Sequence, residues 1–255
     1  MKPLKDTPDN PLLKSGRVGL AVMRVQPLHR GHARLLEVMR QDCDTLIVGV
    51  GSTQHQGVPL HPFTFQQRVE MLKSIFGDSV KPIPLVDIES QLATDDWVDY
   101  VLEKARKLNL PTPTDYYTGS AQDAKWYVNR FAQLTDPVQE VAGVRCHTNP
   151  TTGRRLHVVE RAVTGYPSAT EIRGLVEQRD TEWHNYVPAR LVKYIEWHYP
   201  PHLRVALKAN DLPDPTLYPT GTRLSLATPG DDALYQLYDD GKWRPLSKAD
   251  LKAKY

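Results

Sequence analysis

Short apolar runs alternate with amphipathic segments along most of the chain, and this alternation limits the fold more than any other feature. The runs at 17–23 ("RVGLAVM") and 45–51 ("TLIVGVG") have the continuous apolar character of strands buried on both faces. Between them, residues 31–41 carry apolar side chains at helical spacing. Strands and helices in this order predict an α/β fold, with a Rossmann-like parallel sheet, right-handed crossovers and helices on both faces.

The same alternation continues downstream and then stops. We expect further strands at 81–88, 115–120 and 155–163, and further helices at 63–77, 95–108, 121–131, 168–178 and 188–199. After "YPPHLR", proline-rich turns and short apolar runs predict a small β-rich appendage, with "DDG" as a hairpin turn. The expected organisation is an arm at 1–16, a domain at 17–200 and the appendage at 201–255.

Composition and charge exclude several classes of function. Lys and Arg total 32 against 30 Asp and Glu, so the chain lacks the excess positive charge of a nucleic-acid-binding domain. Cys43 and Cys146 are too few for a disulfide framework or a thiolate zinc site. The N-terminus has no apolar signal segment, and no run approaches the roughly 20 apolar residues that span a bilayer. We therefore expect a cytoplasmic protein with no membrane or nucleic-acid partner.

The stretch "QPLHRGHARLL" places His29 and His32 where the first expected strand turns into a helix. In an open α/β sheet this turn lies at the carboxyl end of a strand, where such folds bind ligands. Gly31 would let a ligand approach the backbone, and free N–H groups at the helix start favour an anion. Protonated imidazoles there would stabilise negative charge in a transition state. Phosphate binding is favoured over a surface role, and a metal site is the weakest alternative because the glutamate of a HExxH site is missing.

A second helix start, in "YPSATEIRG", points to the same chemistry. Ser168 and Thr170 are candidate N-caps, and Arg173 lies one turn further on the same face as Thr170. A phosphate could accept hydrogen bonds from all of these groups, because the hydroxyls, the free N–H groups and the guanidinium point the same way. An ordinary cap beside a surface arginine is the alternative, but two such helix starts on one sheet favour a shared phosphate site.

With its HxGH turn and its late (S)xTxxR helix, the chain resembles the nucleotidyltransferase α/β-phosphodiesterase superfamily. Within it, the chain is similar to nicotinamide mononucleotide adenylyltransferases of the archaeal type and to the related domain of NadR-like proteins. The resemblance runs from about residue 17 to residue 199. It is carried by an ordered set of motifs: "MRVQPLHRGH", "DTLIVGVGSTQ", "HPFTFQQRVEML", "PLVDIES", "DWVDYV", "YYTGS" and "SATEIRGLVE".

This resemblance implies that the 5′-phosphate of nicotinamide mononucleotide attacks the α-phosphorus of ATP in line, giving NAD and pyrophosphate. No covalent enzyme intermediate is expected, so catalysis would rest on positioning and charge stabilisation. Mg²⁺ would be held by ATP phosphates and water, with no protein side chain as metal ligand. The implied partners are ATP and the mononucleotide. The appendage suggests an oligomer-forming or partner-binding surface, and homo-oligomerisation stays open.

The resemblance also assigns roles to individual residues. The implied catalytic residues, of which His32 would be nearest the reacting centre, are His29, His32 and Arg173. The implied contacts to the ATP phosphates come from Arg24, Gly31, Ser168, Thr170 and Arg173. The implied nucleotide-binding residues are Gly119, Asp87, Trp97 and Arg68.

Several of these residues also have a purely structural interpretation. Trp97 fits the core face of an amphipathic helix, Asp87 fits a helix cap or a loop acid, and Arg68 fits a structural pair. Thr64, four residues before Arg68, is expected to cap the helix that follows it. The sequence alone does not separate these interpretations from binding roles.

Two departures from the archaeal pattern affect the choice of substrate. Leu60 and His61 stand where those sequences often carry an arginine and an acid, so one contact is lost or is supplied by His55 or His61. The segment between Asp87 and Trp97 is also longer than usual. Nicotinate mononucleotide, FMN or phosphopantetheine therefore stay open as acceptors. A regulatory sensor that binds ATP or NAD with little turnover is the alternative from another class.

Overall fold

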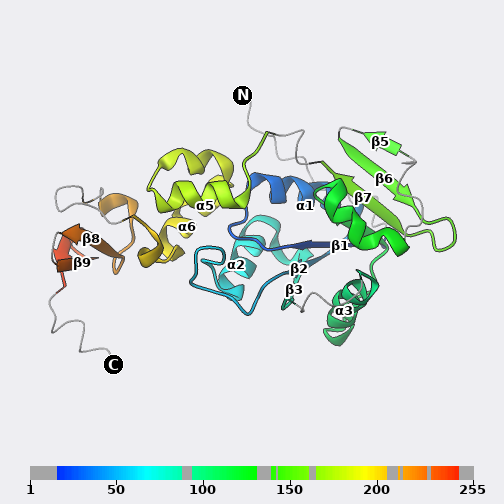
Figure 1. Ribbon diagram of the computed structural model, residues 1–255, viewed down its shortest axis with the longest axis horizontal. Coiled ribbons are helices and arrows are strands. Elements are labelled where there is room, and N and C mark those ends of the chain that lie inside the picture. The colour runs from blue at the N-terminus through cyan, green and yellow to red at the C-terminus, as the bar shows by residue number, and fades with distance from the viewer. Residues whose placement is uncertain are drawn as a thin grey trace.

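A seven-stranded sheet forms the centre of the molecule in the computed structural model (Figure 1). The structure describes residues 16–87, 94–130, 139–141, 143–160, 165–205, 212, 215–228 and 231–246. The strand order is β3-β2-β1-β4-β7-β6-β5. The strands are β1 (Val18–Met23), β2 (Thr45–Val50), β3 (Val80–Pro84), β4 (Asp115–Thr118), β5 (Gln139–Val141), β6 (Val144–Thr148) and β7 (Arg155–Val159).

The parallel sheet expected from the sequence is confirmed in β3, β2, β1, β4 and β7, which pair side by side in parallel. The antiparallel strands β6 and β5, which complete one edge, were not predicted. Their segment, "QEV" and "VRCHT", contains no continuous apolar run, and most side chains of β6 are only half-buried. A short edge strand of this kind lacks the apolar run that identifies a central strand.

Helices cover both faces of the sheet, as expected. The α-helices are α1 (Arg30–Asp42), α2 (Phe65–Phe76), α3 (Thr94–Lys107), α4 (Ala121–Ala124), α5 (Ala169–Glu177) and α6 (Val192–His198). The 3₁₀ turns are η1 (Gly77–Ser79), η2 (Lys125–Arg130), η4 (Thr181–Tyr186), η5 (Ala189–Leu191), η6 (Pro201–Leu203) and η7 (Pro215–Leu217). The helix expected at 121–131 is thus one α turn followed by a 3₁₀ turn.

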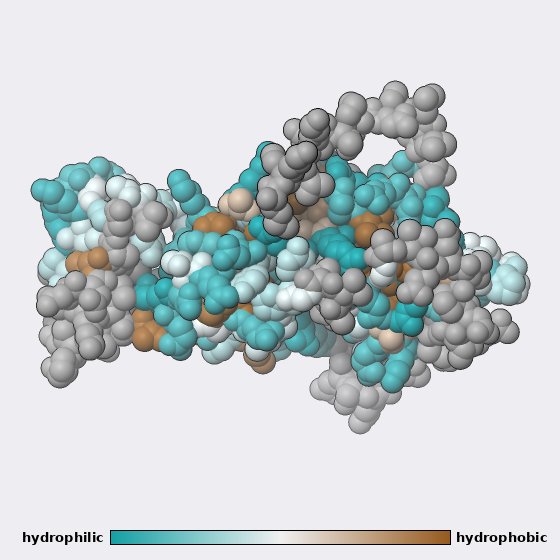
Figure 2. Space-filling view, turned by 90° about the horizontal axis from the view of Figure 1, so that it is seen from above, coloured by the Kyte–Doolittle hydropathy of each residue, from teal (hydrophilic) through white to brown (hydrophobic). Residues whose placement is uncertain are grey.

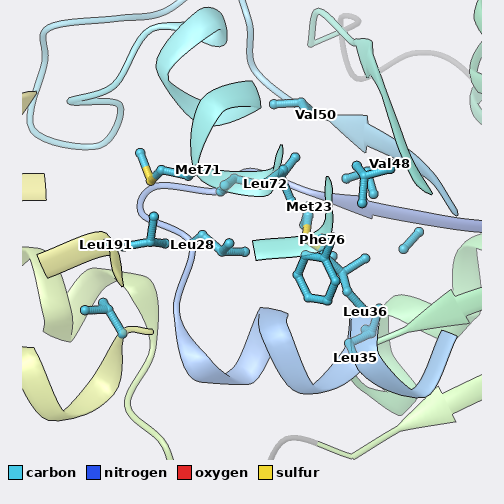
Figure 3. Packing of buried hydrophobic residues seen from close by; sticks show 14 of the residues in the cluster. Met23, Leu28, Leu35, Leu36, Val48, Val50, Met71, Leu72, Phe76 and Leu191 are labelled. Atoms are coloured by element: carbon cyan, nitrogen blue, oxygen red, sulfur yellow. The ribbon is translucent and has the colours of Figure 1, made fainter. Parts of the chain in front are cut away.

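Two separate apolar clusters hold the helices against the sheet. One joins α1, α2, α5 and α6 to one face, and Figure 3 shows its packing between Met23 of β1, Leu36 of α1 and Phe76 of α2. The other joins α3, α4 and η2 to the opposite face through Val98, Val101 and neighbouring side chains. Alternate residues of the central strands enter alternate clusters, because successive side chains of a strand point to opposite faces.

The order of the strands reverses at β1. The chain runs from β1 to β2 and β3 on one side, and then crosses to β4 on the other side. The connections on the two sides of β1 therefore lie on opposite faces and leave a crevice at the carboxyl ends of β1 and β4. This is the place where an open α/β sheet is expected to bind its ligand.

The β-rich appendage is also confirmed as a second sheet, in the order β10-β9-β8. It contains β8 (Arg223–Thr228), β9 (Asp231–Leu237) and β10 (Trp243–Pro245), and the predicted "DDG" turn joins β9 to β10. Figure 1 places β8 and β9 at the opposite end of the long axis from β5 and β6. The division into domains at 17–200 and 201–255 stays a prediction.

The visible surface of the described residues is largely hydrophilic, with small separate apolar patches (Figure 2). None of the helices in the described ranges has the length and apolar character that crossing a bilayer requires.

Candidate functional site

A cavity of about 650 Å³ opens at the carboxyl edge of the sheet, in the crevice beside β1 and β4. Its lining comes from the ends of β1 to β4, from the first turns of α1 and α5, and from α3, α4 and η2. Cavities of this volume are typical of small-molecule sites. It brings together the following residues singled out from the sequence: Arg24, His29, Gly31, His32, Asp87, Trp97, Gly119, Ser168, Thr170 and Arg173.

The two histidines of the first turn stack on each other, with ring centroids 3.8 Å apart. His29 is the N-cap of α1, and its Nδ1 accepts a hydrogen bond from the backbone N–H of Gly31 at 3.1 Å. An accepting Nδ1 carries no proton, so His29 offers only Nε2–H as a donor. The protonation of the two imidazoles beside a bound phosphate stays a prediction.

Gly31 has a structural role beside the expected binding role. A side chain here would place its Cβ 2.9 Å from Cε1 of the His29 ring. The absence of a Cβ therefore lets the His29 ring fold back over the helix start and make its capping bond. Gly31 also lines the cavity, and the approach of a ligand to its backbone stays a prediction.

Arg173 links the second helix start to the first turn. Its Nη1 donates to the carbonyl of Gln26 at 2.9 Å, and its Nη2 donates to Oγ1 of Thr170 at 3.1 Å. The side chain is buried, and burial lowers the pKa of Arg173, as does the nearby charge of Arg24. Within the described ranges no salt bridge joins Arg173 or Arg24 to a carboxylate, so both guanidinium charges are directed at the cavity without a paired acid.

Gln26 was not singled out from the sequence, although it holds this end of the cavity together. Its amide donates to the carbonyl of Phe63 at 3.0 Å and accepts from the N–H of Phe63 at 2.9 Å. The side chain is buried, and its own carbonyl receives Arg173. A polar residue inside the apolar "MRVQPL" stretch was the available signal.

Ser168 caps α5 in a capping box with Glu171. The Ser168 hydroxyl accepts from the N–H of Glu171 at 3.3 Å and donates to its carboxylate at 2.8 Å. The expected N-cap is therefore confirmed for Ser168, whereas Thr170 lies in the first turn and accepts from Arg173. Both residues line the cavity, so the cap and a phosphate contact are compatible.

Asp87 is a loop acid fixed by two neighbours at the end of β2. Its Oδ1 accepts from the Ser52 hydroxyl at 2.8 Å, and its Oδ2 accepts from the Gln54 amide at 3.0 Å. Gln54 also accepts the Asp87 N–H at 3.2 Å. The carboxylate is thus held in one orientation beside the cavity, although Ser52 and Gln54 were noted only as part of a motif.

An aromatic wall of Trp97, Trp126 and Tyr127 lines the other side of the cavity. The Trp97 and Trp126 rings lie 5.0 Å apart, and Tyr127 meets Trp97 edge-on at 6.5 Å. Trp97 also packs against the apolar cluster under α3, so its two interpretations are compatible. Trp126 and Tyr127 were missed, although "KWYV" follows "YYTGS" after only "AQDA", which placed aromatic residues near the end of a strand.

Arg68 lies beneath the cavity and is not among its lining residues. Its guanidinium donates to the carbonyls of Arg24 and Gly51 at 3.0 and 2.7 Å. Burial lowers the pKa of Arg68 to about 10. These bonds join the turns that follow β1 and β2, which agrees with the structural interpretation of this residue. Thr64 caps α2 in a capping box with Gln67, as expected.

His61 is buried next to these turns, and its ring stacks on His55 at 5.3 Å. Burial lowers the pKa of His61, and the charges of Arg24, His55 and Arg68 act in the same direction. Neither histidine lines the cavity. A direct contact from them to a bound nucleotide stays a prediction.

The described part of the chain contains no group of three or more His, Cys, Asp or Glu side chains that could hold a metal ion. The carboxylates that line the cavity are Asp87 and Asp123, while Arg24 and Arg173 supply guanidinium groups and His29 and His32 supply imidazoles. This arrangement suits an anionic ligand whose own oxygens carry any divalent cation.

Comparison with known proteins agrees with these features. The profile of the cytidylyltransferase-like family matches residues 24–173. The chain is 27% identical over 177 residues to the nicotinamide-nucleotide adenylyltransferase of Methanospirillum hungatei JF-1, covering 69% of this chain and 86% of that protein. It is 28% identical over 183 residues to the protein of the same name from Pyrococcus horikoshii, covering 70% and 82%.

A solved structure gives a weaker match. The crystal structure of a bifunctional NMN adenylyltransferase/ADP ribose pyrophosphatase from Francisella tularensis is 18% identical to this chain and superimposes with a TM-score of 0.46. The match covers 71% of this chain and 50% of that protein. A score this low does not support a comparison of the two sites.

Proposed function

Because the chain belongs to the cytidylyltransferase-like family, we propose that it is an adenylyltransferase that joins ATP and nicotinamide mononucleotide to give NAD and pyrophosphate. The relatives that carry the name nicotinamide-nucleotide adenylyltransferase support this choice of substrates. A cytoplasmic location is part of the proposal.

The observation that carries the proposal is the convergence of His29, His32 and Arg173 on one cavity from two distant helix starts. Hydrogen-bond donors and positively charged groups of this kind suit a triphosphate, because they stabilise the negative charge of its oxygens. The aromatic wall on the opposite side gives a surface on which a planar ring can pack. One cavity therefore offers places for both parts of a dinucleotide.

In the proposed reaction, a phosphate oxygen of the mononucleotide forms a bond to the α-phosphorus of ATP. The bond from that phosphorus to the bridging oxygen breaks, and pyrophosphate leaves with the electron pair. Arg24 and His29 would hold the ATP phosphates, with His32 nearest the α-phosphorus. Ser168, Thr170 and Arg173 would bind the leaving pyrophosphate. Rate enhancement would come from positioning and charge stabilisation.

Mg²⁺ belongs to the proposal as a companion of ATP. Bound there, it would neutralise phosphate charge through phosphate and water oxygens. The donor set around the phosphate end fits this arrangement, because imidazoles and guanidiniums line it and Asp87 is already engaged by Ser52 and Gln54.

The proposal is tested by incubating the purified full chain with ATP, nicotinamide mononucleotide and Mg²⁺ and measuring NAD and pyrophosphate. Equal amounts of the two products are expected. Parallel reactions contain nicotinate mononucleotide, FMN or phosphopantetheine in place of the acceptor. Synthesis of FAD or another adenylylated product without NAD would contradict the proposal, as would tight ATP or NAD binding with no turnover, which identifies a sensor.

A further inference from the structure

The two faces of the sheet supply different chemistry to the cavity. The donors for phosphate lie on α1 and α5, which pack in one apolar cluster. The aromatic wall comes from α3 and η2, which pack in the other cluster. Asp123, the carboxylate of α4, lines the cavity on this second side and was not singled out from the sequence.

Asp123 is fixed close to the aromatic wall. Ser120 caps the single turn of α4, with its hydroxyl accepting the N–H of Asp123 at 3.1 Å. Tyr127, one turn further along, meets the Trp97 ring edge-on. Burial raises the pKa of Tyr127, and the charges of Tyr116 and Asp123 act in the same direction. Asp123 lines the cavity together with Trp97, Trp126 and Tyr127.

We propose that Asp123 is a specificity-determining residue that selects a pyridine ring bearing a neutral carboxamide over one bearing a carboxylate. The inference rests on the proposed function and concerns which mononucleotide this site accepts. Asp87 is the other carboxylate in the lining, and it is already engaged by Ser52 and Gln54.

The physical basis is a difference between the two substituents. A carboxamide N–H donates to a carboxylate, whereas a ring carboxylate brings a second negative charge beside it and offers no donor. Asp123 is half-buried in the lining of the cavity, so the repulsion is screened less than in bulk solvent. The positive pyridinium is common to both substrates, and its attraction to Asp123 cancels when the two are compared. Selectivity of this kind depends on the repulsive element as much as on the attractive one.

The test compares kcat/KM for nicotinamide and nicotinate mononucleotide in the full chain and in Asp123→Asn. The unmodified protein should prefer the nicotinamide substrate, and Asp123→Asn should reduce this preference by about tenfold or more, which corresponds to about 1.4 kcal/mol. The KM for ATP should change little, because the phosphate donors lie on the other face. Asp123→Glu keeps the charge and should keep the preference.

Asp78→Asn is the matched control, since Asp78 is an exposed acid at the end of α2 and outside the cavity. It should leave both specificity constants unchanged. Asp123→Ser also removes the charge but places a different side chain there. It tests the same preference if Asp123→Asn does not fold. A preference that survives both uncharged variants overturns the role of Asp123 while NAD synthesis still supports the proposed function. No dinucleotide from either substrate overturns both.

Discussion

The two edges of the parallel sheet differ in whether their positive side chains are paired with a carboxylate. At the amino edge, Arg17, Arg155 and His157 surround the buried carboxylate of Asp115, with Arg155 Nε and His157 Nε2 both 2.9 Å from Oδ1. At the carboxyl edge, Arg24 and Arg173 face a cavity with no acid paired to them in the described ranges. Removing one partner of a buried charge pair destabilises the fold. Charges without a paired acid can instead stabilise the negative charge of a bound ligand.

The amino edge shows how strongly such a network fixes a charge. Burial alone would raise the pKa of Asp115, but hydrogen bonds from His157, Thr114 and Arg17 outweigh it and lower the pKa. The His157 ring also stacks on Tyr117 at 4.3 Å, almost parallel to it. These contacts join β1, β4 and β7 at their first residues. We infer that this edge serves stability and the opposite edge serves binding.

The largest expected effect is therefore on stability. Asp115→Asn removes the charge that two arginines share, and we expect it to lower the free energy of unfolding by about 3–5 kcal/mol. Urea denaturation followed by circular dichroism measures this loss. Asp240→Asn, which breaks an exposed pair with Arg244, should cost at most about 1 kcal/mol. Equal losses in the two variants would contradict the contrast between the edges.

The same network predicts the direction of acid sensitivity. The pKa of Asp115 is lower in the folded chain than in the unfolded chain, so its contribution is complete above the unfolded value of about 4. It is lost as the pH falls through the folded value, because the unfolded chain then binds the extra proton. Urea titrations at a series of pH values should show this loss in the unmodified protein and a shallower dependence in Asp115→Asn.

At the carboxyl edge the expected effect is on turnover. His32→Ala should lower kcat for NAD synthesis by about 10²–10³, the usual cost of one donor to a developing charge. The free energy of unfolding should change little, since His32 is only half-buried. His202→Ala, at an exposed histidine outside the cavity, is the control and should keep full turnover. Full turnover in His32→Ala would remove this residue from the mechanism.

Local sequence patterns predicted the central sheet and the two helix starts. The apolar runs of β1 and β2 and the caps Thr64 and Ser168 depend on neighbouring residues only. Gln26 could not be assigned in this way, since its partner Phe63 lies on a different segment. Nor could the capping bond of His29, which depends on how its ring folds onto Gly31. Interactions between distant segments, or between a side chain and the backbone, leave no periodic signal in the sequence.

Gln26 has both kinds of role, because it stabilises the fold and also positions the site. Gln26→Ala leaves the buried N–H and carbonyl of Phe63 without their partners, and we expect a loss of about 1–3 kcal/mol in unfolding free energy. The turn that holds Arg173 should also shift, so the KM for ATP should rise. Gln26→Glu keeps an acceptor for the Phe63 N–H but buries a carboxylate against the Phe63 carbonyl, so it should cost at least as much stability. A stability loss with an unaltered KM would restrict Gln26 to the fold.

The smallest expected effect is at Ser168, where a variant can separate capping of α5 from contact with the ATP phosphates. Ser168→Ala removes the cap of α5 and should cost about 1 kcal/mol, whereas Ser168→Thr keeps a capping hydroxyl and should cost less. If the same hydroxyl also binds the ATP phosphates, Ser168→Ala should raise the KM for ATP by more than the lost stability explains. Steady-state kinetics at a temperature well below the unfolding transition measures this KM. An unchanged KM would assign Ser168 to the capping box with Glu171 alone. The phosphate end would then depend on Thr170, Arg173 and the two histidines of the first turn.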